Sequence, residues 1–222
     1  MYVSLYIRSG NVVEVVKWNE QMRGATKVEA TLNWDKFSID QMLNYRYTGK
    51  DDQKLVASIT PNLKKEGQYE VMLNNRDDDI GIDQFPWHSY DFEFATLNIM
   101  WPYLKDKKKP FFFYIYDFDY EEKRRPIFKN KGKVNVKFET EDVLKGQTVW
   151  KYSINGPGLN NEGGFIWINP NTWIMMQYQI EKPDEPGYRN GFLTLIETEY
   201  MEPEIWDEFT NEKVVYIPVD EE

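Results

Sequence analysis

The segment Lys133-Val134-Asn135-Val136-Lys137-Phe138-Glu139 alternates between polar and apolar side chains along its whole length. Successive side chains of a β-strand point to opposite faces, so this pattern would place Val134, Val136 and Phe138 on one face of a sheet. Short runs of similar character occupy residues 26–32, 151–154, 165–168, 173–180 and 192–200, and Gly, Asn, Pro or Asp bound them. Strands and turns spaced in this way are typical of an antiparallel sandwich or barrel.

These runs predict an all-β fold built on a strongly curved antiparallel sheet, a half-barrel or partial barrel of about eleven or twelve strands. Two segments interrupt the strand pattern and predict short helices. The first lies near 89–101, where Ser89 could cap a helix that carries Leu97 and Trp101 at helical spacing. The second lies near 203–210, with Pro203 in its first turn. No repeat or low-complexity linker divides residues 1–222, which predicts a single β domain.

The composition excludes several kinds of chemistry. The chain contains no cysteine, which rules out disulfides, cysteine–zinc sites, iron–sulfur clusters and thiol nucleophiles. A single histidine, His88, rules out metal sites that need two or three imidazoles. The net charge of −10 argues against a nucleic-acid partner, because binding to a phosphate backbone requires a cationic surface. We therefore expect no cofactor and no nucleic-acid partner, and the composition leans towards a protein without enzymatic activity while leaving catalysis by carboxylates open.

The compartment has two possible assignments. No apolar run approaches the ~20 residues that a transmembrane helix needs, so we expect no transmembrane segment. The segment Met1–Arg8 alternates like a strand and lacks the features of a signal peptide. One assignment is a periplasmic or exported protein whose leader has been removed. The other is a cytoplasmic protein.

The most aromatic segment is Pro110–Tyr120, which carries rings on both faces of a predicted strand. Such a strand must be covered on both sides, or its exposed rings form a binding surface. Core burial is one interpretation, and a cavity for an apolar molecule or a sugar is the other. For the cavity we predict these lining residues: Trp101, Phe111, Phe113, Tyr114, Tyr116, Trp167 and Trp173.

Acidic residues cluster between Asn74 and Asp83, where oxygen ligands could bind a divalent cation. The candidate ligands are Asp77, Asp79 and Asp83, although their spacing is not that of an EF-hand loop. A solvated loop is the alternative. His88, which precedes the first predicted helix, is either a packed or capping residue or a residue that acts in catalysis or contacts a ligand.

A series of segments carries a resemblance to known proteins. It runs Lys145–Tyr152, Gly156-Pro157-Gly158-Leu159, Gly163–Ile168, Gln177-Tyr178, Pro186-Gly187-Tyr188 and Phe192–Leu195, and it follows His88–Leu97 and Trp101–Leu104. The series resembles a group of uncharacterised bacterial exported β proteins related in architecture to the periplasmic lipoprotein-carrier half-barrels. The resemblance implies a half-barrel fold and a tendency to hold an apolar ligand in a concave sheet.

Three functions remain open at this stage. The leading hypothesis is a non-enzymatic protein that holds a hydrophobic small molecule or lipid, apolar or amphipathic, in the concave face of the half-barrel. The second is a carbohydrate-binding or carbohydrate-active protein that uses aromatic platforms and carboxylates. The third is a structural envelope protein that binds another protein through an aromatic surface. The sequence does not determine the oligomeric state.

Overall fold

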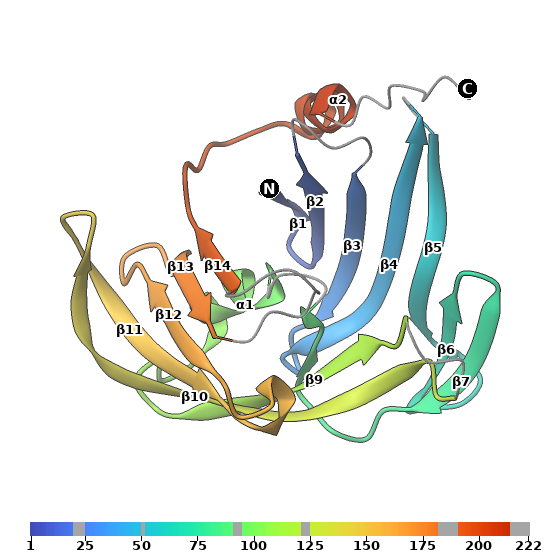
Figure 1. Ribbon diagram of the computed structural model, residues 1–222, viewed down its shortest axis with the longest axis horizontal. Coiled ribbons are helices and arrows are strands. Elements are labelled where there is room, and N and C mark those ends of the chain that lie inside the picture. The colour runs from blue at the N-terminus through green and yellow to red at the C-terminus, as the bar shows by residue number, and fades with distance from the viewer. Residues whose placement is uncertain (20–24, 50–51, 91–94, 121–124, 182–190, 214–222) are drawn as a thin grey trace. The chain divides into compact units, whose positions relative to one another are not determined.

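The computed structural model describes residues 1–19, 25–49, 52–90, 95–120, 125–181 and 191–213 (Figure 1). Within them lie two seven-stranded sheets, one of which curls into a half-barrel, together with two short α-helices. The predicted all-β class and half-barrel are confirmed. The described residues contain fourteen strands, more than the eleven or twelve predicted, and they include short strands outside the predicted runs, at Arg76–Gly81 and Trp87–His88.

Backbone contacts divide the chain into two compact units. Unit 1 comprises Met1–Asp83, Phe118–Phe128 and Glu199–Glu222, and unit 2 comprises Gln84–Asp117 and Lys129–Thr198. The single domain expected for residues 1–222 stays a prediction.

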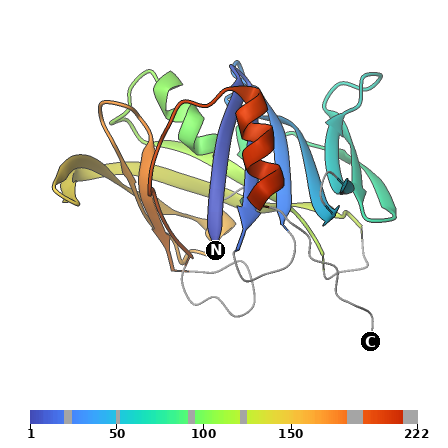
Figure 2. The same cartoon turned by 90° about the horizontal axis from the view of Figure 1, so that it is seen from above.

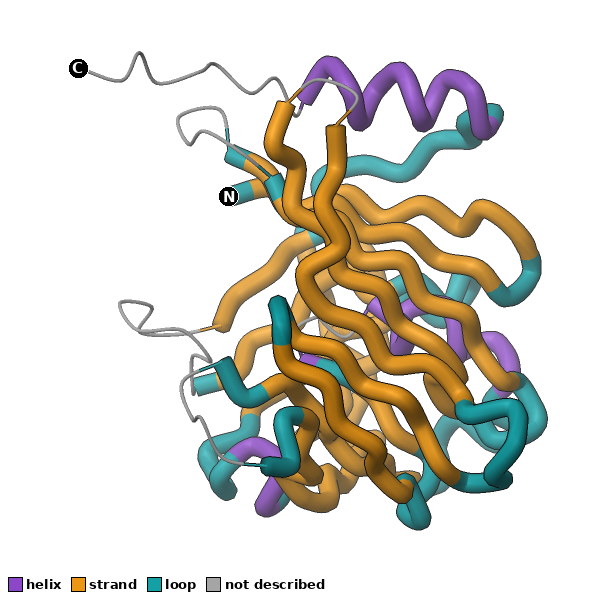
Figure 3. The backbone as a smooth tube through the Cα atoms, turned by 90° about the vertical axis from the view of Figure 1, so that its right-hand side faces the viewer, coloured by secondary structure: helices purple, strands orange, loops and turns teal. Residues whose placement is uncertain are grey.

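Unit 1 carries the first sheet, whose strands follow one another in space as they do in sequence (Figure 3). Its strands are β1 (Tyr2–Ser9), β2 (Val12–Trp18), β3 (Thr26–Asn33), β4 (Ser38–Gly49), β5 (Asp52–Pro61), β6 (Gln68–Leu73) and β7 (Arg76–Gly81). On β3, Val28, Ala30 and Leu32 are buried while the residues between them are more exposed. The alternation in the sequence of residues 26–32 therefore does mark a strand with one buried face.

The helix α2 (Pro203–Lys213) belongs to unit 1 and confirms the helix predicted near 203–210 (Figure 2). Trp206 attaches it to the sheet: the indole is buried and stacks on Tyr6 with ring centroids 5.0 Å apart. The Trp206 Nε1–H also donates to Glu14 Oε2 at 2.9 Å. Glu14 is buried as well, and it accepts from Arg8 and lies 3.0 Å from Lys27 Nζ.

Burial alone would raise the pKa of Glu14. The hydrogen bonds from Arg8 and Trp206, together with the charge of Lys27, outweigh burial and hold that pKa below its ordinary value. Glu14 is therefore ionised at neutral pH, and the buried charge is compensated by two cations and one indole N–H. This arrangement is a structural anchor for α2.

Unit 2 carries the second sheet except for the strand-end residues Phe118 and Phe128, and its strands have the spatial order β14-β13-β12-β11-β10-β9-β8. Its strands are β8 (Trp87–His88), β9 (Phe111–Phe118), β10 (Phe128–Leu144), β11 (Gln147–Asn155), β12 (Gly164–Ile168), β13 (Met175–Ile180) and β14 (Gly191–Thr194). β8 pairs in parallel with β9, and the segment 165–168 forms most of β12, as predicted.

One face of this sheet is covered by the helix α1 (Ala95–Met100) and the 3₁₀ turn η2 (Trp101–Tyr103), and we call it the helix-covered face. The ring centroid of Trp101 lies 4.6 Å from that of Tyr152 and 5.4 Å from that of Phe111. Asn98 Oδ1 accepts from the backbone N–H of Met175 at 2.9 Å. The helix predicted near 89–101 is thus found in its second half, and residues 91–94 lie outside the described part of the chain. Ser89 donates to Asp117 Oδ1 at 2.5 Å.

The glycine-rich segment between β11 and β12 forms a tight connection that includes the 3₁₀ turn η3 (Pro157–Leu159). Gly156 has a φ of 151°, and a Cβ atom there would lie only 2.3 Å from the carbonyl oxygen of Lys133. A Cβ on Gly164 would lie 1.9 Å from the carbonyl oxygen of Gln179. Close backbone approach therefore requires glycine at both positions, and at Gly156 the positive φ requires it as well. The segment Pro186-Gly187-Tyr188 lies outside the described residues.

No helix among the described residues combines the length and the apolar character that crossing a membrane would take.

Candidate functional site

The residues predicted to line a cavity divide between the two faces of the second sheet. Trp101 and Phe113 are 1% and 0% exposed in the core of the helix-covered face. Phe111 and Trp173 are half-buried and pack against the same core. These four side chains therefore belong to or pack against one core, in which the ring centroids of Trp101 and Phe111 lie 5.4 Å apart.

The other three predicted residues lie on the opposite face, which we call the outer face. Tyr114 is half-buried, and Tyr116 is buried with its ring 6.0 Å from that of Trp87. The Tyr116 hydroxyl accepts from Asn130 Nδ2 at 3.2 Å. Trp167 is 8% exposed. The alternation of side chains along β9 places Phe113 on one face and Tyr114 and Tyr116 on the other, so the seven residues cannot form one site.

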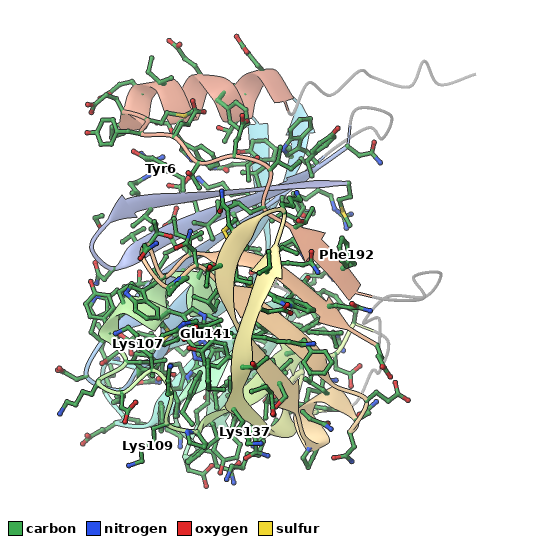
Figure 4. All side chains as sticks on the ribbon, turned by 90° about the vertical axis from the view of Figure 1, so that its left-hand side faces the viewer. Tyr6, Lys107, Lys109, Lys137, Glu141 and Phe192 are labelled. Carbon is green, nitrogen blue, oxygen red and sulfur yellow. The ribbon has the colours of Figure 1, made fainter. Side chains whose placement is uncertain are left out.

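The outer face of β11 to β14 carries two parallel rows of cross-strand neighbours. Strand pairing aligns Lys151, Trp167, Gln177 and Thr194 in one row, and Ser153, Phe165, Gln179 and Phe192 in the next. We call these eight residues the outer strip. Directly opposed side chains have Cβ atoms about 5 Å apart, so each row is continuous. Phe165 and Phe192 are 38% and 57% exposed, and Figure 4 shows Phe192 on β14.

The sequence explains why these side chains point outward. Ile166 and Ile168 of β12 are buried in the helix-covered core, so Phe165 and Trp167 must take the other face. Along β13, Tyr178 and Ile180 are buried, which leaves Gln177 and Gln179 facing outward.

Polar contacts hold the strip and its border in place. The Trp167 Nε1–H donates to Asp142 Oδ2 at 3.0 Å, and the Ser153 hydroxyl donates to Glu139 Oε1 at 2.7 Å. The Lys151 ammonium lies 4.0 Å from the centroid of Phe165 and 5.3 Å from that of Trp167. These distances are those of cation–π contacts.

The two carboxylates beside the outer strip, Glu139 and Asp142, are both ionised. The hydrogen bond from Ser153 lowers the pKa of Glu139, and the nearby Lys137 lowers it further. The hydrogen bond from Trp167 lowers the pKa of Asp142, with a further contribution from the backbone N–H of Val143. The strip therefore offers aromatic rings beside fixed acceptors, an ammonium group and two amides, which suits a ligand with both an apolar face and hydroxyl groups.

His88 is a packed residue. Its side chain is fully buried, Nδ1 lies 2.8 Å from Thr96 Oγ1, and the ring meets Phe113 edge-on at 5.1 Å. Burial lowers the pKa of His88 to about 3, so the imidazole is neutral at physiological pH. This position supports the packed interpretation and places the ring against the core residue Phe113, away from the outer strip.

The structure does not assemble the predicted divalent-cation site. Asp77 and Asp79 lie on β7, whereas Asp83 lies beyond the last residue of that strand, Gly81. Among the described residues, no group of three or more His, Cys, Asp or Glu side chains could hold a metal ion.

A polar hollow of about 450 Å³ does lie on unit 1 beside β5 to β7. Its lining is formed by Ser58, Thr60, Glu70, Val71, Met72, Asp77, Asp78, Asp79 and Arg125. Asp78 lies 3.4 Å from Arg125 Nη1 and accepts from the backbone N–H of Ile127 at 3.2 Å. Asp78 thus serves to attach residues 125–127 to the sheet.

Sequence reasoning assigned Trp167 to a site but missed Phe165, Phe192 and Lys151. The signal that could have found them is the alternation of each strand, in which they take the positions opposite to inward-facing apolar residues. Comparison with known proteins adds no assignment, since no family model, curated protein or solved structure matches the chain.

Proposed function

We propose that the protein is a non-enzymatic carbohydrate-binding protein and that the outer strip of unit 2 is its binding surface. The observation that carries the proposal is the alignment of Ser153, Phe165, Gln179 and Phe192 across four strands. Two strand spacings separate the phenyl rings, ~10 Å, which is about the length of a disaccharide. Two sugar rings one disaccharide unit apart could then stack on the two phenyl rings, while the amide of Gln179 bonds the hydroxyl groups of the sugar between them.

The neighbouring polar groups support the same ligand class. Glu139 and Asp142 are already fixed by hydrogen bonds from Ser153 and Trp167, so their remaining lone pairs can accept from sugar hydroxyls without further ordering. Lys151 adds a donor beside the rings. The helix-covered face supports the apolar-ligand hypothesis less well, because Trp101 and Phe113 are enclosed by the core there.

The test is binding to a panel of soluble polysaccharides, measured by retardation in affinity gels. We expect the wild-type protein to bind at least one glycan, and Phe165→Ala and Phe192→Ala each to weaken that binding about 3- to 10-fold, because each removes one stacking ring. The matched control is Phe112→Ala, which removes a ring that is 41% exposed on β9, outside the strip.

The control variant should bind like the wild type. The proposal fails if no glycan retards the wild-type protein, or if the double variant Phe165→Ala/Phe192→Ala binds as tightly as Phe112→Ala.

A further inference from the structure

Three aromatic rings form a box at the border of the helix-covered face in unit 2. The centroid of Trp150 lies 5.3 Å from that of Phe138 and 5.3 Å from that of Trp173, with interplanar angles of 69° and 73°. All three side chains are half-buried and pack against the core with one side. We call Phe138, Trp150 and Trp173 the aromatic box.

Two lysines of one loop place their ammonium groups over the aromatic box. Lys108 Nζ lies 4.5 Å from the centroid of Trp150 and 4.8 Å from that of Phe138. Lys107 Nζ lies 4.6 Å from the centroid of Trp173. Glu141 completes the surroundings, with Oε1 3.5 Å from Lys108 Nζ. Figure 4 shows Lys107 and Glu141 on the same side of the molecule.

The two lysines are held differently. Lys107 Nζ donates to the carbonyl oxygens of Leu104 and Pro102, at 2.9 and 3.2 Å, so it fixes the loop that follows η2. Lys108 has only the rings and Glu141 as side-chain partners among the described residues, and its side chain is 49% exposed. Because an exposed ion pair contributes little, the Lys108 ammonium can be displaced while Lys107 stays in place.

The position of Trp173 also indicates a binding role. Its φ is 59°, a left-handed conformation that a bulky side chain rarely adopts. The turn that imposes it is fixed by Asn169, whose carbonyl oxygen accepts from the Trp173 N–H at 2.8 Å. Strained backbone of this kind concentrates at sites that hold a ligand in a set geometry, and here it presents the indole to Trp150.

We propose that the aromatic box and Glu141 form a binding site for a small organic cation with a quaternary ammonium group, and that Lys108 occupies this site in the free protein. Faces of aromatic rings attract cations, and a carboxylate at the border adds charge complementarity. A quaternary ammonium group carries methyl groups that fill such a box better than the hydrated ammonium of lysine. The site uses other residues than the outer strip and does not depend on carbohydrate binding.

The test is calorimetric titration of the full chain with choline and, separately, with free trimethyllysine, since the same cation occurs in both. Lys108→Gln should bind the preferred cation about 3- to 10-fold more tightly than the wild type, because it removes the internal competitor. Glu141→Gln should bind more weakly, and Trp150→Leu should show no saturable binding. The control Lys109→Gln changes a neighbouring exposed lysine and should match the wild type.

The neutral tert-butyl analogue of choline separates cation recognition from simple apolar burial, and it should not bind. The proposal is overturned if neither cation binds the wild type or Lys108→Gln, if the neutral analogue binds as tightly as choline, or if Lys108→Gln gains no affinity over Lys109→Gln. Trp150 packs against the core, so Trp150→Leu also changes core packing. Glu141 is 59% exposed, so a loss of affinity in Glu141→Gln reports on cation binding without a change in the core.

Discussion

At the scale of single residues, the structure assigns His88 a role in packing. The sequence left two interpretations open, because a lone histidine before a helix can cap, pack or contact a ligand. What decides between them is the hydrogen bond to Thr96 and the edge of the ring against Phe113. Neither contact can be inferred from the order of residues. His88 lies on β8, which pairs directly with β9, although α1 separates the two strands in the sequence.

Burial of His88 makes stability depend on pH. The folded-state pKa is about 3 and the unfolded value is 6.5, so the unfolded chain binds the extra proton first and stability falls as the pH drops below about 6.5. Between pH 7.5 and 5.5 the wild type should lose about 1.4 kcal/mol more of its free energy of unfolding than His88→Leu does.

Urea unfolding at both pH values measures this difference. The Leu variant is its own control, since every other titrating group is common to the two proteins. An equal loss in both would mean that His88 is not buried as a neutral imidazole.

At the scale of elements, strands with one buried face were predictable and their partners were not. The alternation at 26–32 and 133–139 foretold β3 and part of β10, because burial of one face imposes a period of two. The outer strip depends instead on the register that sets Phe165 opposite Gln179 and Gln179 opposite Phe192. Register is a property of pairs of strands, so no single segment of sequence reveals it.

The helix α2 gives a prediction at this scale. Its attachment depends on Trp206, which is buried, stacks on Tyr6 and donates to Glu14. Trp206→Ala should lower the free energy of unfolding of unit 1 by about 3–5 kcal/mol, since it leaves a large cavity and an unpaired acceptor on a buried carboxylate.

Thermal unfolding followed by near-ultraviolet circular dichroism would measure the loss. The control is Ile205→Ala, an adjacent residue that is 50% exposed and should cost less than about 1 kcal/mol. Similar losses in the two variants would show that α2 is not held through Trp206.

At the scale of the whole molecule, composition limited the chemistry that the sequence allows but did not locate the exposed rings. The absence of cysteine and the single histidine excluded most reactive chemistries, and the abundance of aromatic residues indicated binding. The same abundance did not indicate which rings are exposed. The most aromatic strand, β9, supplies Phe113 and Ile115 to the core, whereas the exposed rings of the outer strip come from less aromatic strands.

The central claim is that the outer strip of unit 2 binds carbohydrate. The most direct measurement is a backbone-amide NMR titration of the wild-type protein with the glycan that it binds most tightly. We expect shift changes concentrated at residues 151–153, 165–167, 177–179 and 192–194, with none at α1 or along β5 to β7. Changes confined to the residues around Trp101 and Phe113, or to the hollow beside Asp77, would contradict it.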